Sequence, residues 1–376
     1  MRTTGSQGLI VGKLKFAAAA AVCLAATGLL APAASADSAV QAPRAASKAP
    51  IYQPGKSKFP VIGANGPVVG VNLWAKENYT TAQTKAYGTR MLSYIKNVLH
   101  AGAVDIVWNF FAPSYTSNQV KWTSSTLTVA NVAILTQIAQ QDHLLVEYRP
   151  MMFVLNAVNN WEGMISPRSD PQWFDAYYHA MIPYLHMAER YHVNEYVAGT
   201  EMDGVSRSPL WNSFLIKCAK IYKGVLSYAD HQYLYFPHKR FQIPPVGLVG
   251  LDDYEPLNLP PTATLAQVVA AYEQYFSTVP ASLLRRTALD ETGIQARAGA
   301  YQEPSFMYIP GTLDTEVQVN WYTAACMAMK RFRLRAVFFW KVDLADNPAF
   351  PASSLSTFEG KPGAQAIGHC AAILAG

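Results

Sequence analysis

Two glutamates stand where they could act together on a substrate. Glu201 directly follows the apolar run 195–200, and Glu291 ends the run 287–291 just before Thr292 and Gly293. If both runs are parallel strands of one barrel, their carboxyl ends share one mouth, and the two carboxylates face each other across it. Such a pair suits the hydrolysis of glycosidic bonds. One carboxyl group delivers a proton, and the other attacks or stabilises the anomeric carbon.

Other carboxylates compete for these roles. Asp290 is the neighbour of Glu291, and adjacent residues of a regular strand point to opposite faces, so we expect only one of them in the barrel mouth. Asp203 and Asp252 are reserve candidates near the same strand ends. Asp252 could instead fix the loop that carries Tyr254.

The elements that must position these side chains are eight short apolar runs separated by helical patterns. The runs are typical of strands covered on both faces, and they span 68–73, 103–111, 144–149, 195–200, 232–236, 246–251, 287–289 and 336–340. Between them, the stretch 265–276 follows helical spacing, and Thr315 could cap a helix through Met329. We therefore predict the α/β class, as a single (β/α)8 TIM barrel. Its fifth crossover must be short, because 237–245 is brief and rich in proline.

The first residues predict export. Basic residues are followed by the small apolar run 16–31 and by Ala34-Ser35-Ala36, the pattern of a secretory signal peptide over 1–36. Residues 37–60 are expected to be a disordered linker or arm, and 61–376 to form the catalytic barrel. The chain has 376 residues and a formal charge of +5. Three positive charges lie in the leader, so the mature protein is nearly neutral, and a basic patch for nucleic acid is unsupported. We expect a secreted protein.

Cysteines, histidines and standard motifs limit the other possibilities. After the leader, at most one disulfide can form, and we expect Cys326–Cys370, with three buried thiols (Cys218 included) as the alternative. The histidines lack metal-binding spacing, and no phosphate-binding, dinucleotide-binding or serine-nucleophile motif is present. We therefore expect no metal and no cofactor. We also expect a monomer with a carbohydrate substrate, no nucleic-acid partner, and no membrane association after signal cleavage.

Short motifs in the chain resemble those of clan A glycoside hydrolases. Residues 199–202 are similar to the acid/base segment, 290–293 to the nucleophile segment, and 249–256 to a sixth-strand segment whose tyrosine supports the nucleophile. Residues 338–340 are similar to the final strand, whose tryptophan floors the subsite of the cleaved sugar. The joint order, from Val68 to Gln365, most resembles glycoside hydrolase family 113, which contains β-mannanases.

The resemblance implies roles for individual residues. Glu201 would be the general acid and then the base, and Glu291, favoured over Asp290, would be the nucleophile of a retaining double displacement. Tyr254 would donate its hydroxyl to Glu291, and Trp340 would stack on the sugar, although a loop tyrosine and a core tryptophan are the plainer alternatives. The implied substrate is a β-linked polysaccharide or oligosaccharide, with β-mannan as the candidate.

Further substrate-binding candidates end the first three predicted strands or follow the third. These are Trp74, Trp108, Asn109, Arg149 and Trp161. Arg149 could equally be an ion-pair partner of Glu147, and Trp161 could simply anchor its loop.

Three residues depart from the clan pattern: Thr200 stands where asparagine is usual, and Ile294 and Lys341 stand where aromatic residues are more common. They make the extension to mannan weaker than the extension to glycosidic chemistry. A non-catalytic glycan-binding TIM barrel, and a glycosidase of other specificity such as a xylanase or an exo-acting enzyme, are therefore the alternatives.

Overall fold

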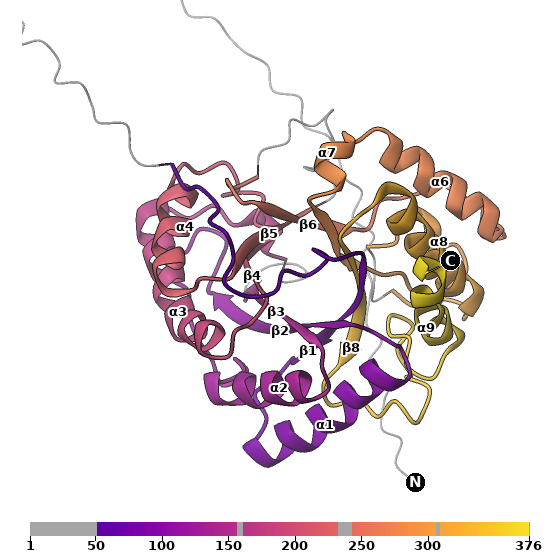
Figure 1. The fold of residues 1–376 in the computed structure, drawn as a ribbon, viewed down its shortest axis with the longest axis horizontal. Coiled ribbons are helices and arrows are strands. Elements are labelled where there is room, and N and C mark those ends of the chain that lie inside the picture. The colour runs from indigo at the N-terminus through magenta and orange to yellow at the C-terminus, as the bar shows by residue number, and fades with distance from the viewer. Residues whose placement is uncertain (1–50, 156–160, 232–242, 306–308, 376) are drawn as a thin grey trace, which may run out of the picture. The chain divides into compact units, whose positions relative to one another are not determined.

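The computed structural model describes residues 51–155, 161–231, 243–305 and 309–375. Eight parallel strands close into one barrel in sequence order, and the helices surround it (Figure 1). The predicted (β/α)8 barrel is therefore confirmed. The strands are β1 (Val68–Trp74), β2 (Ala103–Ala112), β3 (Leu145–Val154), β4 (Glu195–Thr200), β5 (Val225–His231), β6 (Leu248–Asp253), β7 (Thr287–Thr292) and β8 (Ala336–Asp343).

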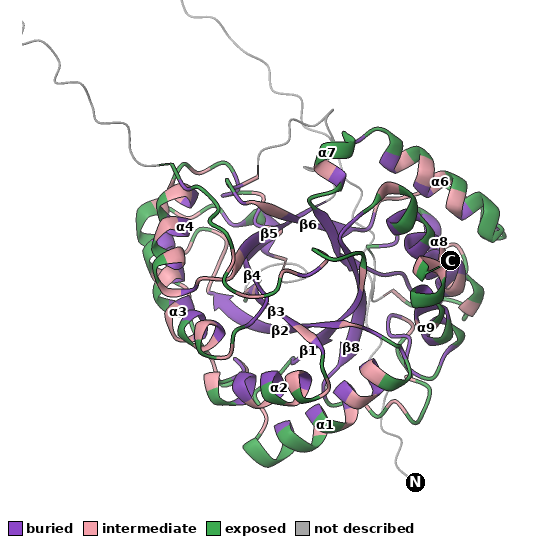
Figure 2. Cartoon of the chain, in the orientation of Figure 1, coloured by how far each residue is buried: buried purple, intermediate pink, exposed green. Residues whose placement is uncertain are grey.

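The helices lie outside the barrel, with their buried faces turned toward it and their exposed faces turned outward (Figure 2). Two of them, α1 and α6, begin with a capping box made by a threonine and a glutamine three residues later. The described helices are α1 (Thr81–Asn97), α2 (Val129–Gln141), α3 (Asp170–Arg190), α4 (Leu210–Ile221), α6 (Leu265–Ser277), α7 (Ala281–Leu284), α8 (Thr315–Phe332) and α9 (Pro362–Ala375).

Two sequence predictions need correction here. The cap of α8 is Asp314, whose side chain accepts a hydrogen bond from the Glu316 amide, and Thr315 is the first helical residue. The fifth strand is Val225–His231, whereas the predicted run 232–236 lies outside the described residues. The sequence favours the run 232–236 because it is more apolar than the true strand, which is interrupted by Ser227 and Asp230. The connection from β5 to β6 spans only 232–247, so the fifth crossover is short.

Residues 51–63 pack against the barrel, contrary to the expected arm over 37–60. Tyr52 is buried in the main core, and Phe59 stacks on His192 with 4.9 Å between ring centroids. Ile62 is buried among strand residues that include Ala103 and Phe338. Three apolar anchors within a polar, proline-containing stretch therefore fix this segment. Residues 37–50 lie outside the described residues.

A disulfide joins the last two long helices. Cys326 on α8 and Cys370 on α9 form the bridge that the sequence predicted, with 5.5 Å between their Cα atoms. Cys218 is buried with a free thiol. Among the described residues, no helix is both long and apolar enough to span a membrane.

Candidate active site

Glu201 is held at the carboxyl end of β4 by an irregular strand end. Between Val197 and Thr200, β4 has one residue more than its partner β5, and Glu201 itself has a φ of 46°. The backbone amide of Glu201 donates to the Ala229 carbonyl at 2.9 Å. Irregularities of this kind redirect a side chain at the rim of a barrel, and here the redirected carboxyl group is only partly exposed.

Trp161, in the loop after β3, contacts the Glu201 carboxyl group directly. Its indole Nε1–H donates to Glu201 Oε2 at 2.6 Å. The indole ring lies against Gly163, where an added Cβ would collide with it. Its other neighbour is the His231 ring, with centroids 5.5 Å apart. Trp161 is therefore a direct hydrogen-bond donor to the predicted proton donor, Glu201.

The environment of Glu201 favours a protonated carboxyl group. Burial raises the pKa of Glu201 to about 7, and the negative charge of Asp203 adds to the rise, while the Trp161 hydrogen bond and Arg149 lower it. A carboxyl group with this pKa can hold a proton near neutral pH and release it to a departing oxygen.

Glu291 lies on β7 and is 4% exposed. The Tyr254 hydroxyl donates to Glu291 Oε2 at 2.8 Å, and the Arg149 guanidinium donates to Oε1 at 3.2 Å. Burial, together with the charges of Asp252 and Glu201, raises the pKa of Glu291 well above its usual value, although Arg149 and Tyr254 act to lower it. The charge of Glu201 raises the pKa of Glu291, so the two carboxyl groups are close enough to interact electrostatically.

Arg149 is the centre of a buried ion cluster inside the barrel. Its side chain is fully buried and lies within 4 Å of five carboxylates from five positions. These are Asp105 at 2.8 Å, Glu147 at 3.7 Å, Asp252 at 3.0 Å, and Asp290 and Glu291 at 3.2 Å each. Burial alone would lower the pKa of Arg149, but these carboxylates raise it well above its usual value. Arg149 therefore does not line a substrate subsite.

Asp290 and Glu291 both reach this guanidinium, which corrects the expectation that only one of them faces inward. In the pairing with β6, Leu251 and Asp252 oppose Leu289 and Glu291, so Asp290 is an extra residue that interrupts the alternation. Gly250 makes room for it, because a Cβ there would collide with the Asp290 carboxylate.

Arg149 faces five carboxyl groups, and burial favours the protonated form of some of them near neutral pH. Burial raises the pKa of Asp105 to about 6, of Asp252 to about 7 and of Asp290 to about 8. Glu291 differs from the other four in accepting hydrogen bonds from both a cation and a phenol. Since both donors stabilise its ionised form, Glu291 is well placed to carry a negative charge.

Aromatic side chains form one wall beside Glu291. Trp74, Tyr254 and Trp340 share a small buried cluster, and the rings of Trp74 and Trp340 lie 5.8 Å apart. The Trp74 indole donates to Asn109 Oδ1 at 3.3 Å. The departure from the clan pattern, Lys341, lies over the Trp74 ring at 4.2 Å and pairs with Asp343 at 2.6 Å. Four predicted substrate-binding residues therefore lie together here: Trp74, Asn109, Tyr254 and Trp340.

Trp108 does not belong to the site. It is fully buried and stacks on Tyr184 of α3 at 4.7 Å, in the layer between the barrel and its helices. Trp108 and Asn109 are neighbours on β2, so their side chains point to opposite faces, and only Asn109 reaches Trp74.

Several polar residues of this region are not among those predicted from the sequence. Asn72 bridges Asp105 and the Asp290 carbonyl through its Nδ2, at 2.8 and 3.0 Å. Glu162, next to Trp161, is buried. Its burial raises the pKa of Glu162 most, and the charge of Glu201 raises it further. Such residues could have been found in the sequence as polar residues within or beside an apolar run. Among the described residues, no three or more histidine, cysteine or acidic side chains are arranged so that they could hold a metal ion.

A closed (β/α)8 barrel with an acidic pair at the ends of β4 and β7 is the architecture of a glycoside hydrolase. The profile of Glycoside Hydrolase Family 113 matches residues 74–350. The chain belongs to this family, as the resemblance implied.

Solved structures with the same fold include members of this family. A GH113 β-1,4-mannanase superposes with a TM-score of 0.69 at 17% identity, covering 81% of this chain and 98% of that one. The β-mannanase AaManA from Alicyclobacillus acidocaldarius, in complex with ManMIm, has the same score and identity, with 83% and 99% covered. GH5_18 from Streptomyces cattleya, in complex with GlcNAc, has a TM-score of 0.55 at 15% identity, with 85% and 81% covered. No curated protein sequence matches significantly.

The Trp161 hydrogen bond makes a prediction about pH. Because this bond lowers the pKa of Glu201, the Trp161→Phe variant should move the alkaline limb of kcat/KM upward, by about one pH unit or less. A pH profile of hydrolysis measures the shift. Trp122→Phe, at an exposed tryptophan, is the control and should leave the limb in place. An unchanged limb in Trp161→Phe would show that the bond does not tune the proton donor.

Proposed function

We propose that this glycoside hydrolase cleaves β-mannan by a retaining, two-glutamate double displacement. The observation that carries the proposal is the contrast between the two carboxyl groups. Glu201 sits beside Asp203 with its pKa raised to about 7, and Glu291 accepts hydrogen bonds from Arg149 and Tyr254. Environments that separate an acid from a base in this way assign their roles.

The roles follow from protonation. The two negative charges repel each other, so near neutral pH we expect one proton on the pair. Burial raises the pKa of Glu291 well above its usual value, but the hydrogen bonds from Arg149 and Tyr254 favour its ionised form, so we assign the proton to Glu201. Glu201 protonates the glycosidic oxygen as that bond breaks, while Glu291 attacks the anomeric carbon. Glu201, now ionised, then takes a proton from the water that releases the sugar from Glu291. Trp340 offers a flat apolar face to the sugar.

The substrate assignment is supported by the family and by its mannanase structures. The test is a panel of β-mannan, glucomannan, xylan and cellulose, with the products followed by proton NMR. We expect hydrolysis of β-mannan, with the β-anomer appearing first. Initial formation of the α-anomer would contradict retention, and faster hydrolysis of xylan would contradict the substrate. Binding to these glycans without hydrolysis would instead favour the non-catalytic barrel.

We further propose that the protein is secreted. The basic and apolar segments before Ala36 support export, and the Cys326–Cys370 disulfide suits an oxidising compartment. Amino-terminal sequencing of protein from the culture medium should begin at Asp37. Retention of uncleaved protein inside the cell would contradict this.

A further inference from the structure

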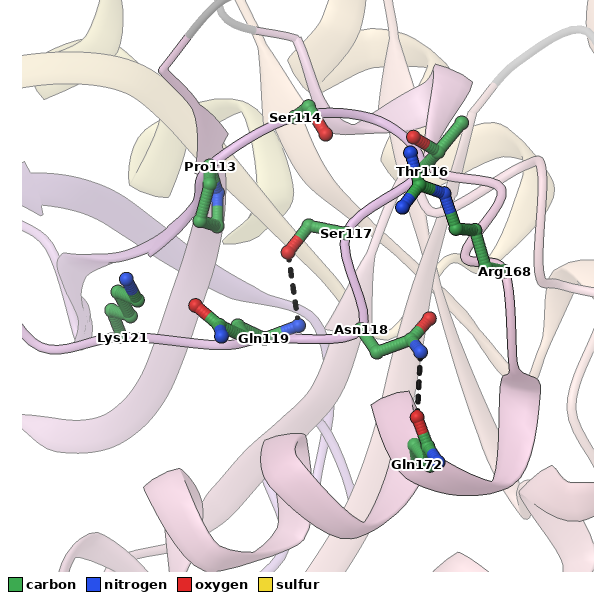
Figure 3. Close-up of a pocket in the computed structure, with 9 residues that line it drawn as sticks. All are labelled: Pro113, Ser114, Thr116, Ser117, Asn118, Gln119, Lys121, Arg168 and Gln172. Carbon is green, nitrogen blue, oxygen red and sulfur yellow. Dashed lines mark hydrogen bonds between the residues drawn. The ribbon is translucent and has the colours of Figure 1, made fainter.

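A polar groove of about 540 Å³ shares no lining residue with the candidate active site and has no role in the proposed reaction. It is lined by the loop after β2, by Arg168 before α3, and by Gln172 in the first turn of α3 (Figure 3). Strand ends of this kind form the catalytic face of a barrel. The groove therefore opens on the same face as Glu201 and Glu291.

One loop connects the groove to the proton donor. The loop after β3 carries Trp161, which binds Glu201 at 2.6 Å, and it ends at Arg168 in the groove. Its backbone is fixed between the two by hydrogen bonds from the Ser166 amide to the Tyr115 carbonyl at 2.9 Å and from the Arg168 amide to the Thr116 carbonyl at 3.2 Å. One continuous stretch of backbone, 161–168, therefore joins the partner of the proton donor to the groove.

The groove contains two cations and no carboxylate. Lys121 and Arg168 are exposed, and among the described residues neither side chain has an ion-pair partner. The other lining residues are hydroxyl and amide residues and one proline. Figure 3 shows Lys121 and Arg168 toward opposite ends of the lining, so an acidic chain lying along the groove would meet a positive charge at each end and no lining carboxylate.

Two of the three lining amide groups add to this preference, because the carbonyl oxygens of Asn118 and Gln172 already accept hydrogen bonds. Asn118 Oδ1 accepts from the Ser169 amide at 2.9 Å, and Gln172 Oε1 accepts from Asn118 Nδ2 at 2.7 Å. This leaves the Gln172 amide nitrogen as a donor beside the two cations. The groove consequently offers donors, and its natural ligand is a group rich in acceptors.

We propose that this groove binds an oxyanion substituent, either a carboxylate or a phosphate ester, on the glycan that the active site cleaves. The inference rests on the proposed function for the identity of the glycan and narrows its substrate class to an acidic mannan. The guanidinium of Arg168 supplies a planar pair of donors, and Lys121 supplies a second charge.

The experiment measures glycan binding by calorimetry in the catalytically inactive Glu291→Gln background. The probes are neutral mannan, mannan bearing glucuronic acid, and phosphorylated mannan, each at low and high salt. We expect the acidic glycans to bind about tenfold or more tightly than neutral mannan at low salt, and less so at high salt. The carboxylated and phosphorylated probes distinguish the two sources of the oxyanion.

Two pairs of substitutions make the result specific. Lys121→Gln with Arg168→Gln should abolish the preference for acidic glycan. Lys85→Gln with Arg285→Gln removes the same charge from exposed positions outside the groove and should retain it. Equal binding of neutral and acidic mannan, or equal loss in both double variants, would overturn the inference.

The two proposals fail separately. If the unsubstituted enzyme hydrolyses neutral mannan while acidic mannan shows no binding advantage, the groove inference fails and the proposed function stands. If the enzyme hydrolyses none of these glycans, the proposed function fails, and the calorimetric comparison still decides whether the groove selects oxyanions.

Discussion

The Glu291→Gln variant is expected to lose hydrolysis of β-mannan by about 10⁴-fold or more. Glutamine has the same shape but cannot form the glycosyl ester, and it removes the charge that Arg149 and Tyr254 stabilise. The protein should remain folded, because the substitution takes a negative charge out of a cluster that already holds a surplus of carboxyl groups. Initial rates on mannan, with a circular dichroism spectrum to confirm the fold, measure the effect.

The matched control for this prediction is Asp290→Asn. Asp290 is adjacent, equally buried and bound to the same guanidinium at 3.2 Å, so its substitution removes a carboxylate from the same cluster. A smaller loss than in Glu291→Gln is expected. If Asp290→Asn were inactive and Glu291→Gln retained full activity, the nucleophile would have been assigned to the wrong neighbour.

The Arg149→Met variant is expected to destabilise the barrel by about 3–5 kcal/mol at neutral pH. Methionine fills much of the same space but leaves the surrounding carboxyl groups without their cation. Equilibrium unfolding in urea measures the loss. Arg149→Lys keeps a charge without the planar fork and should lose less.

The destabilisation should depend on pH with a definite sign. The pKa values of Asp105, Asp252 and Asp290 are raised to about 6, 7 and 8. Groups whose pKa is raised on folding bind protons in the folded state, so they oppose folding more as the pH rises. The deficit of Arg149→Met should therefore be largest above pH 8 and shrink as the pH falls through this range. A deficit independent of pH would show that Arg149 acts through packing alone.

Much of the fold could be predicted because seven of the eight strands contain mainly apolar runs between helical stripes. The exception, β5, alternates apolar residues with Ser227 and Asp230, and a more hydrophobic run follows it. The packing of residues 51–63 was overlooked because single anchors such as Tyr52 and Ile62 make no periodic pattern.

The catalytic candidates could be predicted because they end strands, but the ion cluster could not. Asp105 and Asn72 lie in the middle of apolar runs, and only closure of the barrel brings them to Arg149 and Asp290. Alternation along a strand also has limits as a guide. It would have excluded Trp108, yet it failed at Asp290, where an extra residue in β7 turns two neighbours inward.

The central claim is that Glu291 attacks the sugar, and trapping the covalent intermediate tests it most directly. The enzyme is incubated with 2-deoxy-2-fluoro-β-mannosyl fluoride, which slows release of the sugar, and is then digested and analysed by tandem mass spectrometry. The account predicts one added fluorosugar on the peptide that contains Glu291, with fragments placing it on that residue. A label on Asp290, Asp252 or Glu201 would contradict the account.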